Sequence, residues 1–189
     1  MFHEIPKPMI DVMRELEAQD RKDHTISKQV PPDVGRLLAI LAASAGTGTW
    51  LELGTSCGYS AMWLSLACRL RGTRLITVDA DPQKVRIATQ NLERAQVQDL
   101  VEVVEGDSIE QLDHYDSLDF CFIDAGGGKG TYDIVVPKMK PGGLFIYDHT
   151  KARGAEIIAA ASADHRVDAV LVPIASDDAR TELICRRCP

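Results

Sequence analysis

The sequence predicts an α/β fold in which helices cover both faces of a mainly parallel sheet that contains one antiparallel strand. Two observations predict this fold class. From residue 50 onward, short apolar runs alternate with helical stretches, which is the succession expected of β-α-β units. The last two apolar runs are separated only by residues 175–180, which is long enough for a hairpin but too short for a crossover helix.

Two further segments precede this alternation. Apolar side chains recur on one helical face over residues 9–16, and a polar run over residues 20–28 follows. Two prolines then open a second helix, whose apolar stripe lies within residues 34–41. We expect residues 1–189 to form a single domain, with residues 1–30 as an appended helix and linker.

The alternating elements follow in chain order. The expected strands are the runs WLELG, RLITVD, VEVVEG, DFCFID and GLFIYD, and then VDAVLVPI and TELICRR. Helices are expected over residues 57–70, 82–95, 108–112 and 152–163, and a glycine-rich loop with a short helix separates the fourth and fifth strands. Asp177, Asp178 and Arg180 are expected to form the final hairpin turn.

The composition excludes several classes of protein. Hydrophobic residues make up 45% of the chain and charged residues 26%, which indicates a globular rather than a disordered protein. The 28 acidic and 21 basic side chains give a net charge of −7, which disfavours nucleic acids and anionic membranes as partners. Because a basic leader and a long apolar stretch are both missing, we expect a cytoplasmic protein with a small-molecule partner.

Polar residues gather where the expected parallel strands end. Residues 52–60 contain the end of the first strand and the turn after it, Asp79 ends the second strand, and residues 106–108 end the third. Asp124 ends the fourth strand, and residues 148–149 end the fifth. Because ligands of open parallel sheets bind beyond the carboxyl ends of the strands, this edge is the expected binding site.

The turn after the first strand favours a ligand that contains a nucleoside. Gly54 and Gly58 allow a tight turn and a close approach, and the helix that follows offers unpaired amides to a carboxylate or a phosphate. Asp79 stands about 25 positions after this turn, where a carboxylate can accept hydrogen bonds from both hydroxyls of a ribose.

Two cofactor classes remain open on these residues. A nicotinamide dinucleotide uses the same glycine turn and ribose acid, but its fingerprint has a second glycine where this loop has Ser56, and it does not require Glu52. An acid ahead of the turn suits a cationic amino group better than a pyrophosphate. The residues therefore favour S-adenosylmethionine, which has an amino-acid end and a nucleoside end, over NAD.

Five blocks of the sequence together resemble one known family. LELGTSCGYSAMWLS, LITVDADP, VEGDS, FCFIDA and PGGLFIYDH are similar, in order and spacing, to blocks of the catechol and caffeoyl-CoA type O-methyltransferases, over residues 30–173. The resemblance implies a Rossmann-like class I methyltransferase fold with a seven-stranded sheet. It also implies S-adenosylmethionine as the methyl donor and, as is common in the family, a homodimer.

The resemblance also implies roles for residues around the methyl donor. Glu52 would bind the methionine amino group, and Asp79 the ribose hydroxyls. The residues near the methionine carboxylate would be Tyr59, Ser60 and, through its amide, Val30; those around the adenine would be Asp107 and Ser108. The whole expected cofactor-binding set is Val30, Glu52, Gly54, Thr55, Ser56, Gly58, Tyr59, Ser60, Asp79, Gly106, Asp107, Ser108 and Asp124.

On the acceptor side, the resemblance implies a divalent cation. Its ligands would be Asp124, Asp148 and His149, and the candidate cations are Mg²⁺, Mn²⁺ and Ca²⁺. The bound cation would lower the pKa of the acceptor hydroxyl. The family has an Asn where this chain has His149, and a histidine shifts the preference toward manganese, zinc or iron, or marks loss of the site.

Asp124 and Lys129 are the expected catalytic residues. A lysine near the metal can take the proton of the acceptor hydroxyl when desolvation and nearby cations lower its own pKa. The family usually carries this lysine three positions after the metal-binding aspartate, whereas three glycines here place Lys129 five positions after Asp124. A solvated surface lysine is the alternative interpretation.

The expected activity is methyl transfer from S-adenosylmethionine to a hydroxyl of a small acceptor, such as a catechol, with metal assistance. The family commonly has a long substrate loop after the residue matching Asp148, and its absence here predicts a shallow acceptor pocket or one completed by a second subunit. Three alternatives stay open. They are a metal-independent methyltransferase with Asp124 or His149 as the base, a nicotinamide-dependent oxidoreductase, and a nucleoside-binding regulator without transfer activity.

Overall fold

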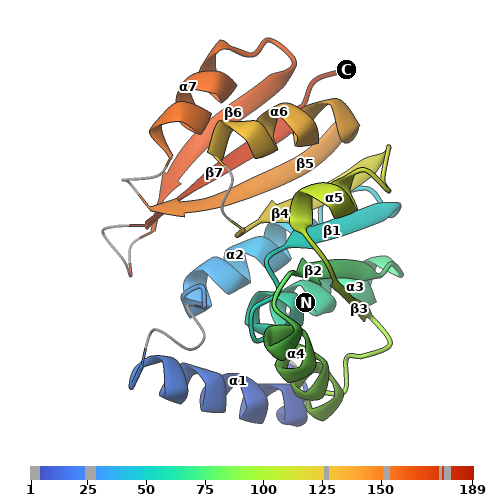
Figure 1. Ribbon diagram of the computed structural model, residues 1–189, viewed down its shortest axis with the longest axis vertical. Helices are drawn as coiled ribbons and strands as arrows, with labels where there is room; N and C mark the ends of the chain where they lie inside the picture. Colours follow the sequence, from blue (N-terminus) through green and yellow to red (C-terminus); the bar gives the residue numbers. More distant parts are fainter. Residues whose placement is uncertain (1–4, 24–28, 126–127, 151–153, 175, 177–179) are drawn as a thin grey trace.

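A seven-stranded sheet with the strand order β3-β2-β1-β4-β5-β7-β6 runs through the molecule (Figure 1). The computed structural model describes residues 5–23, 29–125, 128–150, 154–174, 176 and 180–189, with the backbone alone at 149 and 150. The strands are β1 Thr49–Leu53, β2 Leu75–Asp79, β3 Val101–Glu105, β4 Leu118–Ile123, β5 Met139–Thr150, β6 Val167–Pro173 and β7 Arg180–Arg187.

The strand pairing confirms the predicted fold class. β1 is parallel to β2 and β4, β2 is parallel to β3, and β4 is parallel to β5, whereas β7 is antiparallel to both β5 and β6. The strand order reverses between β1 and β4. In doubly wound sheets, ligands bind at the carboxyl ends of the strands on either side of this reversal.

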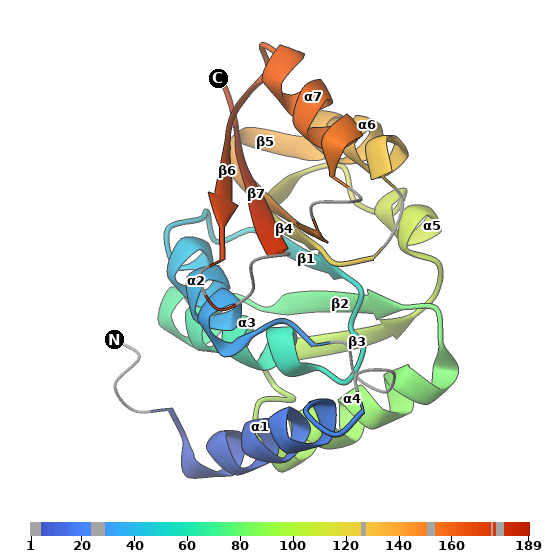
Figure 2. The same cartoon turned by 90° about the vertical axis from the view of Figure 1, so that its left-hand side faces the viewer.

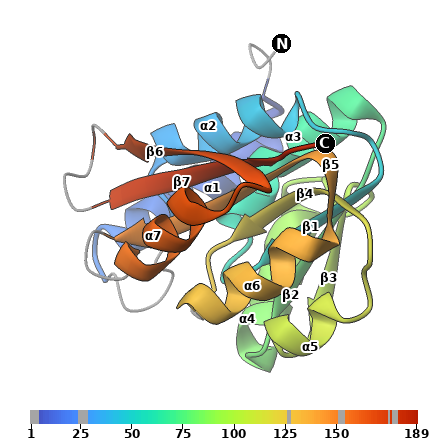
Figure 3. The same ribbon diagram turned by 90° about the horizontal axis from the view of Figure 1, so that it is seen from above.

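Helices cover both faces of the sheet (Figures 2 and 3). α1 to α4 contribute buried side chains to a hydrophobic cluster on one face, and α5 to α7 contribute to a cluster on the other. The helices are α1 Lys7–Asp20, α2 Pro32–Ala42, α3 Tyr59–Arg71, α4 Pro82–Arg94, α5 Ser108–Leu112, α6 Gly128–Lys138 and α7 Ala155–Ala163.

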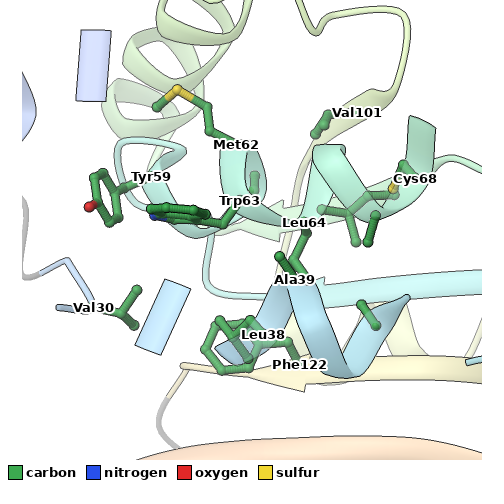
Figure 4. Packing of buried hydrophobic residues seen from close by; sticks show 14 of the residues in the cluster. Val30, Leu38, Ala39, Tyr59, Met62, Trp63, Leu64, Cys68, Val101 and Phe122 are labelled. Atoms are coloured by element: carbon green, nitrogen blue, oxygen red, sulfur yellow. The ribbon is translucent and has the colours of Figure 1, made fainter. Parts of the chain in front are cut away.

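Side-chain alternation along the strands creates these two clusters. Trp50 of β1 and Phe120 of β4 belong to the cluster beneath α1 to α4, where their ring centroids lie 5.3 Å apart. Figure 4 shows part of this cluster, in which side chains from α2, α3 and β4 meet. Phe145 of β5 belongs to the other cluster, and its ring lies 5.8 Å from that of Tyr132 in α6.

The expected N-terminal helix is α1, which packs against α3 and α4. The hydroxyl of Tyr59, at the start of α3, donates a hydrogen bond to Glu17 Oε1 at 2.7 Å. Arg94, at the end of α4, lies 2.5 Å from Glu15 Oε2. The apolar face of α1 is buried, so the amphipathic pattern at 9–16 predicted both the helix and its inner face.

Several boundaries differ from the expectations. Gly128, expected in a glycine-rich loop, begins α6. Arg180, expected in the final turn, is the first residue of β7, because this end of the strand pairs with Thr150 of β5. The rest of that turn, with Asp177 and Asp178, lies outside the described residues. Within the described part of the chain, no helix is both long and apolar enough to cross a membrane.

Candidate functional site

Backbone hydrogen bonds join the tips of neighbouring strands at one edge of the sheet. The amide of Gly106, after β3, donates to the carbonyl of Asp79 at 3.0 Å, and the amide of Gly54, after β1, donates to the carbonyl of Val78 at 2.9 Å. The amide of Asp124, after β4, donates to the carbonyl of Leu53 at 2.8 Å. The polar segments that follow these strands therefore lie beside one another, as the topology predicts.

The loop between β1 and α3 adopts a backbone that depends on its glycines. Gly54 has a φ of +104°, and a Cβ there would lie 3.0 Å from the carbonyl carbon of Asp124. Gly58 has a φ of +83° and caps the N-terminus of α3. Ser56 also takes a left-handed φ, of +47°, which is uncommon for a residue other than glycine and is typical of functional loops. The loop thus passes close to the tip of β4.

Glu52 is a fully buried acid in the middle of the sheet. Its register partner in β2 is Thr77, whose hydroxyl donates to Glu52 Oε2 at 2.6 Å. The Thr77 hydroxyl also lies 2.6 Å from the hydroxyl of Thr55 in the loop. Among the described residues, Glu52 Oε1 has no hydrogen-bond partner. A buried acceptor without a partner is costly, so Oε1 is available to a ligand that reaches it.

Burial raises the pKa of Glu52 to about 7, and the neighbouring Asp79 adds to the rise, whereas the hydroxyls of Ser60 and Thr77 oppose it. Glu52 is therefore close to its titration midpoint at neutral pH. A cationic group placed at Oε1 would favour the carboxylate form.

Asp79 is held at the tip of β2 by two backbone amides. Its Oδ2 accepts a hydrogen bond from the amide of Ser56 at 2.8 Å, and its Oδ1 accepts one from the amide of Asp81 at 3.0 Å. These contacts fix the carboxylate beside the loop while the side chain remains partly exposed. This is the position of a ribose-binding acid in dinucleotide and nucleoside sites.

Replacement of Asp79 by alanine is expected to weaken binding of S-adenosylhomocysteine by about 1 to 3 kcal/mol, the cost of losing a charged hydrogen-bond partner. Titration calorimetry measures this change. Asp81→Ala, which removes the neighbouring carboxylate at the N-terminus of α4, serves as the control. An unchanged affinity in Asp79→Ala would contradict the ribose assignment.

The segment after β3 has a structural role that the motif did not reveal. Asp107 Oδ1 accepts hydrogen bonds from the amides of Ile109 at 2.8 Å and Glu110 at 3.2 Å, so Asp107 is the N-cap of α5. Ser108 is the first residue of that helix, and Gly106 connects it to the tip of β2. The predicted contacts of Asp107 and Ser108 with adenine stay predictions.

Loss of this cap should be measurable. Asp107→Ala is expected to lower the free energy of unfolding by about 0.5 to 2 kcal/mol, whereas Asp107→Asn, which keeps a capping oxygen, should change it by a few tenths. Urea denaturation compares the two variants. Equal destabilisation by both would contradict the capping role.

Three other predicted cofactor residues lie at the start of α2 and α3. Val30 and Tyr59 are buried members of the same hydrophobic cluster (Figure 4). The hydroxyl of Tyr59 donates its hydrogen bond to Glu17 of α1, so the Tyr59 side chain anchors the N-terminal helix. Ser60 is buried in the first turn of α3, next to Glu52.

A second group of acidic side chains lies at the ends of three neighbouring strands, β4, β5 and β7. Asp148 of β5 is the direct register partner of Glu182 of β7, and Asp124 follows Ile123, whose partner in β5 is Tyr147. Side chains at paired positions project from the same face of a sheet. We call these three residues, Asp124, Asp148 and Glu182, the acid row.

The positively charged side chain of Arg180 lies beside the acid row. Its Nη1 atom lies 2.7 Å from Asp148 Oδ2, and only 15% of the Arg180 side chain and 7% of the Asp148 side chain are exposed. Glu182 is fully buried. Burial and the nearby Asp148 raise the pKa of Glu182 to about 10 and also raise that of Asp124. Arg180 balances the charge of Asp148, and a proton on Glu182 makes that side chain neutral as well.

Two of the three predicted metal ligands, Asp124 and Asp148, have described side chains. Among the described residues, no three His, Cys, Asp or Glu side chains are placed to hold a metal ion. One oxygen of Asp148 is occupied by the guanidinium of Arg180. The side chain of His149 lies outside the described part of the chain, so its predicted role as a ligand stays a prediction.

Lys129 lies at the surface in the first turn of α6. Its Nζ atom is 2.5 Å from Asp133 Oδ2, one helical turn away, and about half of each side chain is exposed. This is the geometry of an ordinary exposed ion pair. The contact favours the solvated surface lysine over the catalytic alternative.

The O-methyltransferase family profile matches residues 4–183. The chain belongs to the O-methyltransferase family. Two of its relatives are catechol O-methyltransferases. The one from Niastella koreensis is 32% identical over 127 residues, which cover 64% of this chain and 57% of that protein. The one from Mycobacterium tuberculosis is 32% identical over 129 residues, covering 66% and 58%. The matches confirm the predicted resemblance, although the chain spans less than two thirds of the length of either relative.

Solved structures of methyltransferases share the fold. An O-methyltransferase from Bacillus cereus in complex with SAH has a TM-score of 0.78 at 24% identity, and the match covers 99% of this chain and 93% of that one. An SAH-bound methyltransferase from Podospora anserina has a TM-score of 0.80 at 19% identity, covering 99% and 90%. The predicted Rossmann-like methyltransferase fold is thus confirmed for this member of the O-methyltransferase family.

Sequence reasoning missed Arg180 and Glu182 as site residues of this O-methyltransferase family member. Both lie in β7, whose pairing with β5 brings them to Asp148. The signal available was Glu182, an acid followed directly by the apolar run at residues 183–185, since a charge in the buried part of a strand is unusual.

Proposed function

We propose that this chain transfers the methyl group of S-adenosylmethionine to a hydroxyl of a small acceptor. The single observation that carries the proposal is the arrangement of Glu52 and Asp79 on either side of the glycine loop. Glu52 presents a buried oxygen without a partner in the described chain, and Asp79 is fixed at the tip of the next strand. One acid suits the amino group of the methionine part, and the other suits the ribose.

The loop between these acids fits the rest of the methyl donor. Gly54 and Gly58 keep the backbone free of side chains where it turns, and α3 presents its N-terminal amides beyond Gly58. A methionine carboxylate is the negative group that such a helix N-terminus favours. Both structural neighbours described above were solved with SAH, which supports the same type of ligand here.

The acid row is the proposed acceptor side. Asp124 lies closest to the loop, since the missing Cβ of Gly54 would contact its backbone. When bound, S-adenosylmethionine supplies a methyl carbon that the acceptor oxygen attacks as the carbon–sulfur bond breaks, leaving S-adenosylhomocysteine and a methylated oxygen. The hydroxyl proton passes to a carboxylate oxygen of the acid row, with Asp124 as the proposed acceptor of the proton.

The finer features of the prediction remain proposals. A catechol is proposed as the acceptor because two relatives bear the name catechol O-methyltransferase. We assign no step to a divalent cation, because Arg180 pairs with Asp148, one of the predicted metal ligands. A homodimer stays a prediction.

Titration calorimetry and a transfer assay test the proposed function together. We expect S-adenosylhomocysteine to bind with a dissociation constant of roughly 1 to 100 µM, whereas NAD produces no heat of binding. With S-adenosylmethionine carrying a labelled methyl group, label should pass to members of a panel of catechols and phenols. Tight NAD binding without a response to S-adenosylhomocysteine would favour the oxidoreductase, and binding without transfer to any acceptor would favour the regulator.

A further inference from the structure

The acid row has a cation built into the fold. The guanidinium of Arg180 pairs with the Asp148 carboxylate at 2.7 Å, and both side chains are largely buried. A charge in such surroundings is costly unless it is paired, so removing either member leaves an uncompensated charge. The ion pair is therefore a fixed part of the site and not a transient surface contact.

The sheet register explains why Arg180 reaches Asp148. In the antiparallel pair of β5 and β7, Asp148 is opposite Glu182 and Thr150 is opposite Arg180. Arg180 is two residues before Glu182, so both project from the same face as Asp148. A diagonal neighbour at this spacing is within reach of a long side chain. Two paired strands, and not a loop, thus position the guanidinium.

This position conflicts with a divalent cation. Asp148 is one of the three residues that the family resemblance implies as metal ligands, and a cation bound to its carboxylate would lie within a few ångströms of the guanidinium. Two positive charges at that distance repel each other strongly where water is largely excluded. A guanidinium is also permanently charged. It holds a carboxylate in a fixed geometry, whereas a weakly bound ion does not.

We propose that Arg180 supplies the positive charge of the acceptor site in place of a divalent cation, so that methyl transfer by this chain requires no metal. The proposal rests on the proposed methyltransferase function. Arg180 acts as a positioning residue: it holds Asp148 in place and offsets the negative charge that develops on the acceptor oxygen as its proton leaves for the acid row. The bond between the acceptor oxygen and the methyl carbon forms as the carbon–sulfur bond breaks, the proton passes to Asp124, and no other reactant is needed.

The first test measures metal binding without an acceptor or a methyl donor. Mn²⁺ is titrated into the protein and the free ion is followed by electron paramagnetic resonance. For the wild type we expect a dissociation constant above about 1 mM, and for Arg180→Met a value at least about tenfold lower, because Asp148 is then uncompensated. Wild-type binding below about 100 µM that is lost in Asp148→Asn would overturn the proposal.

The second test measures transfer to catechol after treatment with a chelator. The wild type is expected to keep its rate, and added Mg²⁺ or Mn²⁺ to change it less than about twofold. Arg180→Met should lose at least about tenfold in kcat with little change in the affinity for S-adenosylhomocysteine, and Arg180→Lys, which keeps a charge, should recover part of the loss. Rate loss in the chelated wild type that is restored by metal would overturn the proposal.

A matched control separates the ion pair from general effects on β7. Arg186 lies on the same strand with its side chain exposed, and its Nη1 donates to the Gly142 carbonyl at 3.2 Å. Arg186→Met should change neither Mn²⁺ binding nor transfer. If Arg180→Met does not fold, the wild-type Mn²⁺ titration and Arg180→Lys still decide the outcome. Failure of the proposed function would appear separately, as absence of S-adenosylhomocysteine binding in the wild type.

Discussion

Replacement of Asp124 by asparagine is expected to lower kcat by about 10²-fold to 10⁴-fold, the range for loss of a group that accepts a proton in the transition state. Asp124 lies at the tip of β4, where the loop after β1 packs against its backbone, and its side chain begins the acid row. The same variant should bind S-adenosylhomocysteine within about threefold of the wild-type affinity, since the loss concerns the transition state and not the cofactor.

Steady-state kinetics with catechol and calorimetry with S-adenosylhomocysteine check this prediction. Asp168→Asn is the matched control, because Asp168 is an exposed aspartate on β6, away from the strand tips of the site. Equal losses of kcat and of cofactor affinity in Asp124→Asn would point to a structural role. An unchanged kcat would remove Asp124 from the mechanism.

Replacement of Glu52 by glutamine is expected to weaken S-adenosylhomocysteine binding by roughly 10-fold to 100-fold at pH 8, through loss of the ion pair with the amino group. The wild-type affinity should also fall as the pH drops below about 7, because the pKa of Glu52 is raised to about 7 and protonation removes the charge. Calorimetry at several pH values checks both effects. In Glu52→Gln this pH dependence should be absent.

The same residue links binding to stability. Its pKa in the folded protein lies above the ordinary value of 4.5, so its favourable contribution is full below about pH 4.5 and is lost as the pH rises through about 7. The shift corresponds to roughly 3 kcal/mol at higher pH. Without ligand, Glu52→Gln should therefore be more stable than the wild type at pH 8 and nearly equal to it at pH 5. Urea denaturation at the two pH values gives the comparison, and equal stability at pH 8 would contradict the burial of a charged Glu52.

The arrangement of the proposed cofactor side could be anticipated from the sequence because it depends on local pattern. Glu52 and Asp79 lie at the carboxyl ends of the first two strands, Gly54 and Gly58 lie in the loop after the first, and parallel strands bring these ends together without further information. Asp107 is the exception. A carboxylate after a strand and before a helix suits both a ligand contact and an N-cap, and only the bonds to the amides of Ile109 and Glu110 identify the cap.

The acceptor side could not be anticipated in the same way. Its arrangement depends on the register between β5 and β7, strands about thirty residues apart whose pairing is set by packing and not by a short motif. A one-residue slip would place Arg180 and Glu182 on the opposite face. For this reason Arg180 was predicted in a turn. Lys129 was predicted as a catalytic residue from its distance along the chain to Asp124, and sequence distance did not indicate its ion pair with Asp133 at the surface.

The most direct test of the whole account is a crystal structure of the protein with S-adenosylhomocysteine. The amino group of the ligand should lie within hydrogen-bond distance of Glu52 Oε1, and the ribose hydroxyls within that distance of the Asp79 carboxylate. The sulfur should point toward Asp124. A ligand found elsewhere, or a loop after β1 that holds a pyrophosphate in a parallel soak with NAD, would contradict the assignment of this edge as a methyl-donor site.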